Sequence, residues 1–129
     1  MGTRSLTFVY DEKHEPIINL YRQYDGYPSG HGTELAEFLS GIEEITNGIR
    51  GGETRVTANG MGCLAAQLVA KFKTEVGGFY LYPVNNTDCG QEYEYHVFKD
   101  RVVVKDYDKE IFKGTWANFL NFCATSEIP

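Results

Sequence analysis

The stretch LYRQYDGYPSGHGT at residues 20–33 connects an alternating apolar run to a helical pattern, and the predicted fold is arranged around this connection. Its glycines and proline break both regular patterns, so its composition predicts a loop. Connections in compact domains usually run about 2–6 residues. This one is longer and gathers tyrosine, arginine, serine and histidine at the N-terminus of the helix that follows, a place that we call a helix mouth. Such a gathering indicates a binding loop. The alternative is a structural loop whose tyrosines anchor the core.

Two β-strands are predicted before this loop. Residues 5–10 alternate between apolar and polar side chains, which is the period of a strand, and residues 17–21 are again rich in β-forming types. The polar connection DEKHEP at residues 11–16 joins the two runs into a hairpin.

Three helices are predicted after the loop. The first begins at Thr33 as N-cap and can end at Asn47-Gly48, the second covers residues 61–76, and Thr115 caps a short third. In each, apolar residues recur at helical spacing. The predicted buried stripes are Leu35, Phe38, Leu39, Ile42 and Ile45; then Leu64, Leu68, Val69, Phe72 and Val76; and finally Trp116, Phe119, Leu120 and Cys123.

Three further strands are predicted, at residues 79–84, 92–98 and 101–105, and the last two form a hairpin. The charged run at residues 106–113 is assigned to no strand. The segment at residues 49–59 is either a long loop or a poor strand, and its sequence does not decide between them.

The element order predicts an α+β fold in a single domain over residues 1–129. Hairpins dominate, so we expect a mostly antiparallel sheet of about five strands. Two longer helices and a short C-terminal helix would cover one face of that sheet.

The net charge of −6 argues against long DNA or RNA as a partner, because polyanion binders usually carry a basic surface. A small anionic ligand is compatible with it, since a few arginines and backbone amides can hold a phosphate. Aromatic residues make up 14% of the chain, a surplus that either lines a pocket or fills a small core.

Three cysteines without a CxxC pattern indicate free thiols in a reducing cytosol, so we predict a cytoplasmic protein. No leader pattern and no apolar run of membrane-spanning length is visible. His14, His31 and His96 lack the spacing of metal ligands, so neither a metal nor a cofactor is predicted.

The favoured site is a ligand pocket at two helix mouths, PSGHGT at residues 28–33 and ANGMG at residues 58–62. Both can offer free backbone N–H groups to an anion, provided that they lie close together. The alternative is that these glycines serve only as turns. The predicted ligand contacts are the cations Arg4 and Arg22, the rings of Tyr24 and Tyr27, and Ser29, His31, Thr33, Asn59 and Met61.

A catalytic interpretation of the same loop is weaker. Asp25, Ser29 and His31 supply an orienter, a nucleophile and a base, but one short loop rarely aims three such groups correctly. A small phosphodiester hydrolase using His31 and Asp25 therefore stays an alternative to a non-enzymatic binder. A further alternative is a protein-interaction module that inhibits a host enzyme through its aromatic surface.

The opening MGTRSLT and the block YRQYDGYPSGHGTELAEFL resemble a group of short proteins carried by many tailed bacteriophages. The likeness continues weakly through NGIRGG and NGMGCLAAQLVA and then fades. The group that the chain resembles is identified as including the phage sponge proteins, which bind the cyclic oligonucleotide signals of the bacterial CBASS defence without cleaving them. The resemblance implies a cyclic dinucleotide such as a cyclic GMP–AMP as ligand, a homo-oligomer, and action in the host bacterial cytosol.

Overall fold

The computed structural model describes residues 2–48 and 57–126. Residues 49–56, most of the segment whose structure the sequence left open, lie outside the described residues. The elements in chain order are β1 (Ser5–Tyr10), β2 (Pro16–Arg22), the π-helical turn η1 (Pro28–Gly32), α1 (Thr33–Ser40), β3 (Glu44–Thr46), β4 (Thr57–Asn59), α2 (Gly60–Phe72), β5 (Phe79–Tyr82), β6 (Tyr93–Val97), β7 (Val102–Asp106), β8 (Lys109–Gly114) and α3 (Trp116–Ala124).

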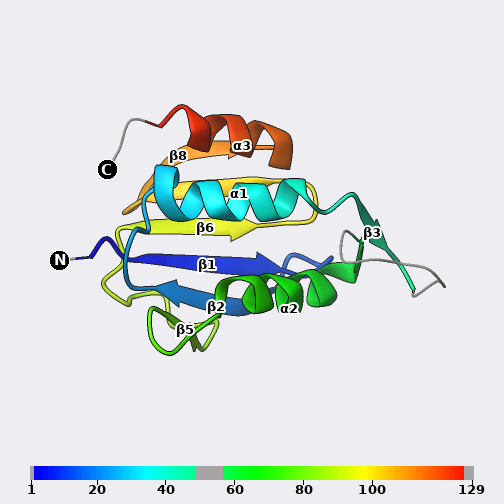
Figure 1. Cartoon of the computed structure of the whole chain (residues 1–129), viewed down its shortest axis with the longest axis horizontal. Helices are drawn as coiled ribbons and strands as arrows, with labels where there is room; N and C mark the ends of the chain where they lie inside the picture. Colours follow the sequence, from blue (N-terminus) through cyan, green and yellow to red (C-terminus); the bar gives the residue numbers. More distant parts are fainter. Residues whose placement is uncertain (1, 49–56, 127–129) are drawn as a thin grey trace.

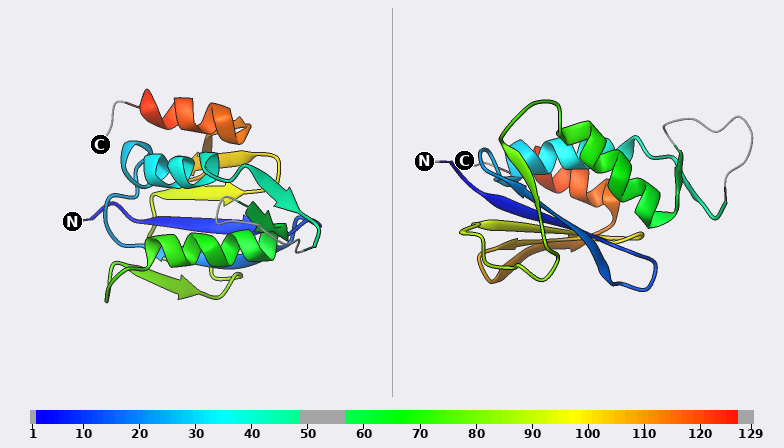
Figure 2. Two further views of the ribbon diagram at one scale, coloured as in Figure 1. Left: turned by 45° about the vertical axis from the view of Figure 1, so that its right-hand side comes forward. Right: turned by 90° about the horizontal axis from the view of Figure 1, so that it is seen from below.

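The chain forms two layers, with all three α-helices on the same face of a sheet (Figures 1 and 2). Within the described residues the main sheet has six strands in the order β5-β2-β1-β6-β7-β8. A separate two-stranded sheet, β3-β4, lies beyond the end of α1. The α+β prediction is confirmed.

The central strand β1 is buried on both faces. Val9 points toward the helices and Leu6 toward the opposite face, and neither has any exposed surface. Alternation of side chains along a strand gives each face its own set, so one strand belongs to two apolar clusters. The larger cluster lies between sheet and helices, and the smaller one gathers Leu6, Phe8 and Tyr21 under Tyr10, Tyr82 and Cys89.

The detailed sheet prediction needs correction. The sheet has six strands rather than about five, and β1 pairs with β6 in parallel, so the sheet is mixed although its other pairs are antiparallel. The extra strand is β8, which lies in the charged run where no strand was predicted. As an edge strand it exposes Lys109, Glu110 and Lys113, so its charged side chains do not oppose pairing with β7.

The predicted helix limits were wrong at three places. Thr33 is already helical, because the turn η1 precedes it. Helix α1 ends at Ser40, and Ile45 belongs to β3 instead of extending the helix. Helix α2 ends at Phe72, since Lys73 leaves the helical conformation and donates hydrogen bonds from Nζ to the carbonyl oxygens of Gly77 and Phe79.

The N-cap of α3 was predicted correctly. Thr115 is extended, and its hydroxyl oxygen accepts a hydrogen bond from the backbone N–H of Asn118 at 3.1 Å. This satisfies one of the N–H groups that have no partner within the helix. The start of α3 is further fixed by its first residue, Trp116, whose indole N–H donates to the backbone carbonyl oxygen of Phe98 at 2.9 Å.

Candidate functional site

The first predicted helix mouth, at residues 28–33, is closed by its own hydrogen bonds. The backbone N–H of Gly30 donates to the carbonyl oxygen of Tyr27 at 2.9 Å, and that of His31 donates to the carbonyl oxygen of Asp25 at 2.8 Å. The hydroxyl of Thr33 donates to the carbonyl oxygen of Pro28 at 3.3 Å. These donors are used in forming the turn η1, so this mouth offers an anion fewer N–H groups than its sequence suggests.

His31 lies inside the protein rather than in a pocket. Its ring has no exposed surface and is within 5.0 Å of the Phe72 ring and 5.1 Å of the Tyr95 ring, between centroids. Its Nε2 is 2.7 Å from the hydroxyl oxygen of Thr7, and its Nδ1 is 3.3 Å from Nη1 of Arg22. Burial, reinforced by the Arg22 charge, lowers the pKa of His31 to about 3.

Arg22 is committed to partners within the chain. Its Nε donates to the carbonyl oxygen of Tyr24 at 2.7 Å, and its Nη1 pairs with a carboxylate oxygen of Glu34 at 3.2 Å. The guanidinium also lies over the Phe79 ring, 4.9 Å from its centroid, and the side chain is only 12% exposed. A phosphate at Arg22 would have to compete with Glu34.

Other predicted residues of this loop lie nearer the surface. Tyr24 is 55% exposed, while Tyr27 is half-buried and its hydroxyl donates to the Asp25 carboxylate at 3.2 Å. Ser29 is also half-buried. Arg4 is half-buried, and its guanidinium lies so close to Gly90 that a Cβ there would be 2.8 Å from Nη1. Tyr24 is therefore the most accessible ring for stacking in this region.

The structure does not assemble a catalytic group from Asp25 and His31. The Asp25 side chain contacts the Tyr27 hydroxyl, and its link to His31 runs through its own backbone carbonyl. Since the His31 ring is enclosed and both of its nitrogens have partners, a substrate has no path to it in this conformation.

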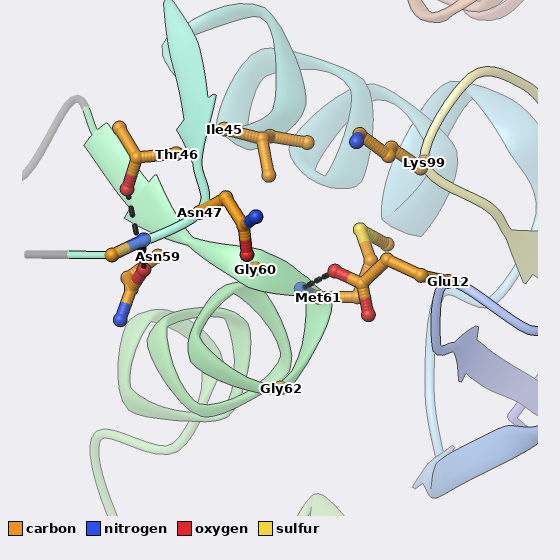
Figure 3. A pocket seen from close by; sticks show the side chains of 10 residues that line it. Glu12, Ile45, Thr46, Asn47, Asn59, Gly60, Met61, Gly62 and Lys99 are labelled. Atoms are coloured by element: carbon orange, nitrogen blue, oxygen red, sulfur yellow. Dashed lines mark hydrogen bonds between the residues drawn. The ribbon is translucent and has the colours of Figure 1, made fainter.

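The second predicted mouth, at the start of α2, opens into a polar cavity of about 610 Å³. That volume lies within the roughly 300–1,000 Å³ of typical small-molecule sites. Figure 3 shows the side chains around it, which come from the β1–β2 connection, β3, β4, the first turn of α2 and the β6–β7 turn. The lining residues are Glu12, Ile45, Thr46, Asn47, Gly48, Asn59, Gly60, Met61, Gly62 and Lys99.

A carboxylate already occupies the N-terminus of α2. Glu12 Oε2 accepts a hydrogen bond from the backbone N–H of Met61 at 2.8 Å (Figure 3). Gly60 permits this approach, because it has φ +80° and a Cβ there would be 3.2 Å from the same oxygen. Negative charge is stabilised at a helix N-terminus, so Glu12 holds the position that an incoming phosphate would favour.

Asn59 joins the two short strands on which this cavity is built. Its Oδ1 accepts from the backbone N–H of Gly48 at 2.7 Å and from the Thr46 hydroxyl at 3.3 Å. Strands β3 and β4 pair in parallel from Glu44–Thr57 to Thr46–Asn59. The predicted residue Asn59 thus fixes the cavity wall through its side-chain oxygen Oδ1. The hydrogen-bond donors of the Asn59 side chain are on its amide nitrogen Nδ2.

The two predicted mouths lie at opposite ends of the sheet within one subunit. His31 contacts Phe72, the last residue of α2, whereas Asn59 and Met61 stand at its first turn. A helix of 13 residues spans about 20 Å at 1.5 Å per residue. The structure therefore brings Asn59 and Met61 to one cavity and keeps the Gly/Tyr loop away from it, so a single-subunit pocket combining both regions is not formed.

Comparisons with protein-family models, curated proteins and solved structures found no match. The phage resemblance therefore stays a prediction. In the part of the chain that the structure describes, no helix is long and apolar enough to cross a membrane. Nor do the described residues group three or more His, Cys, Asp or Glu side chains in a way that would hold a metal ion.

Sequence reasoning missed both of the charged residues named in the cavity lining. Glu12 lies in a polar hairpin connection and Lys99 in a Lys-Asp turn, and both were treated as ordinary turn residues. The parallel pairing of β1 with β6 brings them together, because it places the connections that follow both strands at the same end of the sheet. That pairing joins distant segments and is not visible in local periodicity.

Proposed function

We propose that this chain binds a cyclic oligonucleotide immune signal and holds it without cleavage, thereby inhibiting the bacterial CBASS defence. The observation that carries the proposal is the polar cavity of about 610 Å³ at the start of α2. It combines a cation, carboxamide groups and helix N–H groups in one recess, a set of donors suited to a small anionic ligand.

Each part of the cavity suits a part of such a ligand. Lys99 would pair with a phosphate, and the N–H groups of the first α2 turn that Glu12 does not use would add donors. Asn47 and the side-chain amide nitrogen of Asn59 would hydrogen-bond ribose or base. Ile45 gives the recess an apolar wall against which a base can lie.

The Gly/Tyr loop enters this proposal through a second subunit. Tyr24 and Tyr27 would stack on a base and Arg4 would approach a phosphate, but they lie at the far end of the sheet from Met61. A ligand that meets both regions must lie between two copies. We therefore propose a homo-oligomer in which the loop of one subunit faces the α2 cavity of its neighbour.

A non-enzymatic role is supported by the position of His31. The hydrolase alternative needs this imidazole as a base, yet the ring is fully buried between Thr7 and Arg22. Ligand recovered intact after denaturing the complex agrees with sequestration, whereas recovery of a linear nucleotide would establish hydrolysis.

The test is the melting temperature of the protein against a panel of cyclic di- and trinucleotides, because a ligand that binds only the native state raises it. Lys99→Gln should weaken binding by about 10- to 100-fold, the effect of losing a charge-assisted hydrogen bond of about 1.5–3 kcal/mol. Lys113→Gln, an exposed change on the edge strand β8, is the matched control. No shift with any nucleotide would reject the proposal.

A second candidate is the protein-interaction inhibitor, favoured by the edge strand β5. Its Tyr80 and Leu81 are 44% and 58% exposed, and an edge strand can accept a strand from a partner. This candidate predicts that Leu81→Lys abolishes capture of a host protein while the nucleotide panel gives no shift.

A further inference from the structure

We infer that two copies of this chain pair through the edge strand β5, antiparallel to each other and about a two-fold axis at Leu81. This inference rests on the proposed function and adds the strand through which its subunits associate. Its basis is an unprotected strand edge beside exposed apolar side chains, at the margin of the sheet beyond β2 (Figures 1 and 2).

The two edge strands of the main sheet differ in their protection against further pairing. An edge strand has a row of backbone N–H and C=O groups without partners in the sheet, and charged side chains are a common means of keeping foreign strands away. Strand β8 exposes Lys109, Glu110 and Lys113. Strand β5 reads Phe-Tyr-Leu-Tyr and carries no charge. The edge at β5 is therefore the one suited to accept another strand.

Exposed apolar side chains gather at the same edge. Among the described residues six large apolar side chains are exposed, and three of them are Val76, Tyr80 and Leu81. The connection that carries Val76 lies beside Tyr80, since a Cβ at Gly77 would be 3.7 Å from the Tyr80 hydroxyl. Val76 is fully exposed, and Leu81 is 58% exposed. Apolar surface next to an open strand edge is typical of a protein–protein interface.

The pairing centres on Leu81 because the start of β5 is already occupied. The backbone N–H of Phe79 donates to the carbonyl oxygen of Gly77 at 2.9 Å, and the carbonyl oxygen of Phe79 accepts from Lys73 Nζ at 2.8 Å. An antiparallel pair centred on Leu81 sets this leucine opposite its own copy and Tyr80 opposite Tyr82 of the other copy. Opposite residues share a face of the sheet, so apolar side chains meet across the pair.

A second copy is the occupant that the proposed site requires. Phe79 lies opposite Arg22, at the end of the sheet where the Gly/Tyr loop begins. Tyr82 lies opposite Asn19, toward the end where Glu12 contacts the first turn of α2. An antiparallel pair of β5 strands reverses this direction from one copy to the other. The loop of each subunit then lies at the same end of the combined sheet as the cavity of its neighbour.

The width of the paired strands fits one ligand between the two regions. Neighbouring strands lie about 4.8 Å apart, so three spacings separate the β2 strands of the two copies by about 14 Å. A two-fold axis perpendicular to the sheet also keeps the helices of both copies on one face. The Gly/Tyr loop follows β2 and α2 packs over β2, so both lie next to this junction.

The test is the molar mass of the protein in solution by light scattering, with and without the cyclic nucleotide panel. We expect a dimeric wild type. Leu81→Lys and Leu81→Glu each set like charges opposite one another at the two-fold axis. Each should raise the dissociation constant of the dimer by about 100-fold, the effect of losing a central interface contact. An equal mixture of the two variants should dimerise again, because lysine then faces glutamate, and this recovery requires that residue 81 meets residue 81.

The control is Tyr107→Lys, which places a lysine at another exposed position, 66% exposed and between β7 and β8, and should leave the dimer unchanged. Melting curves check that all variants fold. A wild type that stays monomeric with every nucleotide, single variants that remain dimeric, or a mixture that stays monomeric overturns the inference. A host protein bound at β5 of a monomeric chain also overturns it.

The melting temperatures separate this inference from the binding proposal. A nucleotide that raises the melting temperature of a chain that stays monomeric leaves the binding proposal standing without this interface. A dimer that responds to residue 81 as expected, with no shift from any nucleotide, supports the interface and rejects the binding proposal.

Discussion

Arg22 donates a hydrogen bond to His31, with 3.3 Å between Nη1 and Nδ1, and this contact fixes the state of the buried ring. A guanidinium can only donate, so Nδ1 must carry a lone pair. The proton of the neutral ring is then on Nε2, which donates to the Thr7 hydroxyl oxygen at 2.7 Å. A second proton on Nδ1 would point at a cation, which is why the ring stays neutral.

The stability of the protein should fall on acidification below pH 6.5. The unfolded chain binds a proton at His31 near pH 6.5, whereas the folded chain does so only near pH 3, so acid favours unfolding. This contribution is complete above pH 6.5 and lost by about pH 3. Acidification to pH 5 should cost about 2 kcal/mol at this site, at 1.4 kcal/mol per pH unit. Urea unfolding at pH 5 and above pH 6.5 should show this loss of unfolding free energy, and His31→Gln should show a smaller loss. An equal loss in the variant would assign the effect to other groups.

Removing the Thr7 hydroxyl should destabilise the fold. Thr7→Val has a similar shape but leaves the His31 Nε2–H without its acceptor in a site closed to water. An unsatisfied buried donor costs about 1–3 kcal/mol. Thr7→Ser keeps the acceptor and should lose less, and the difference between the two midpoints of urea unfolding measures this contact. Equal midpoints would show that the hydroxyl contributes nothing.

Two glycine substitutions should act in opposite directions. Gly26→Ala would place a Cβ within 2.9 Å of backbone atoms of Arg4 and Ser5, which cannot move aside easily. We expect it to cost about 1–3 kcal/mol. Gly62→Ala meets nothing within 4 Å in helix α2 and should gain about 0.5–1 kcal/mol from helix propensity. Thermal unfolding of both variants against the parent provides the measurement.

Cys123 should resist thiol reagents in the native protein. It is buried against Gly32 between α3 and the turn η1, and burial raises the pKa of its thiol to about 12. At pH 8 it has almost no thiolate, the reactive form. Mass spectrometry after labelling should find Cys123 unmodified until urea is added. Fast labelling of Cys123 without denaturant would mean that α3 separates readily from the sheet.

Much of the fold was predictable because its signals are local. The alternation in β1 and the hairpin of β6 and β7 are set by neighbouring residues, and the Thr115 cap needs only its own helix. Strand β8 was missed since its charged residues face solvent at an edge and conceal the half-buried Ile111 and Phe112. Helix α2 was predicted too long, because apolar Val76 continues the period although it is fully exposed.

The candidate site was predictable only in part. Asn59 and Met61 were chosen from the glycine-rich mouth of α2, and both line the cavity. His31 was chosen from its glycine neighbours, yet Thr7 and Phe72, distant in sequence, enclose it. Glu12 and Lys99 meet at the cavity through the pairing of β1 with β6, which composition and spacing do not encode.

The parallel pairing of β1 with β6 also sets the order in which the protein can be completed during synthesis. Ser5 lies opposite Tyr93, so β1 is synthesised long before its second neighbour β6 exists. Until then β1 can form only the hairpin with β2, and its other edge is open to foreign strands. Closing so long a loop is slow compared with forming a hairpin, so the unpaired edge of β1 favours aggregation of the incomplete chain during that interval.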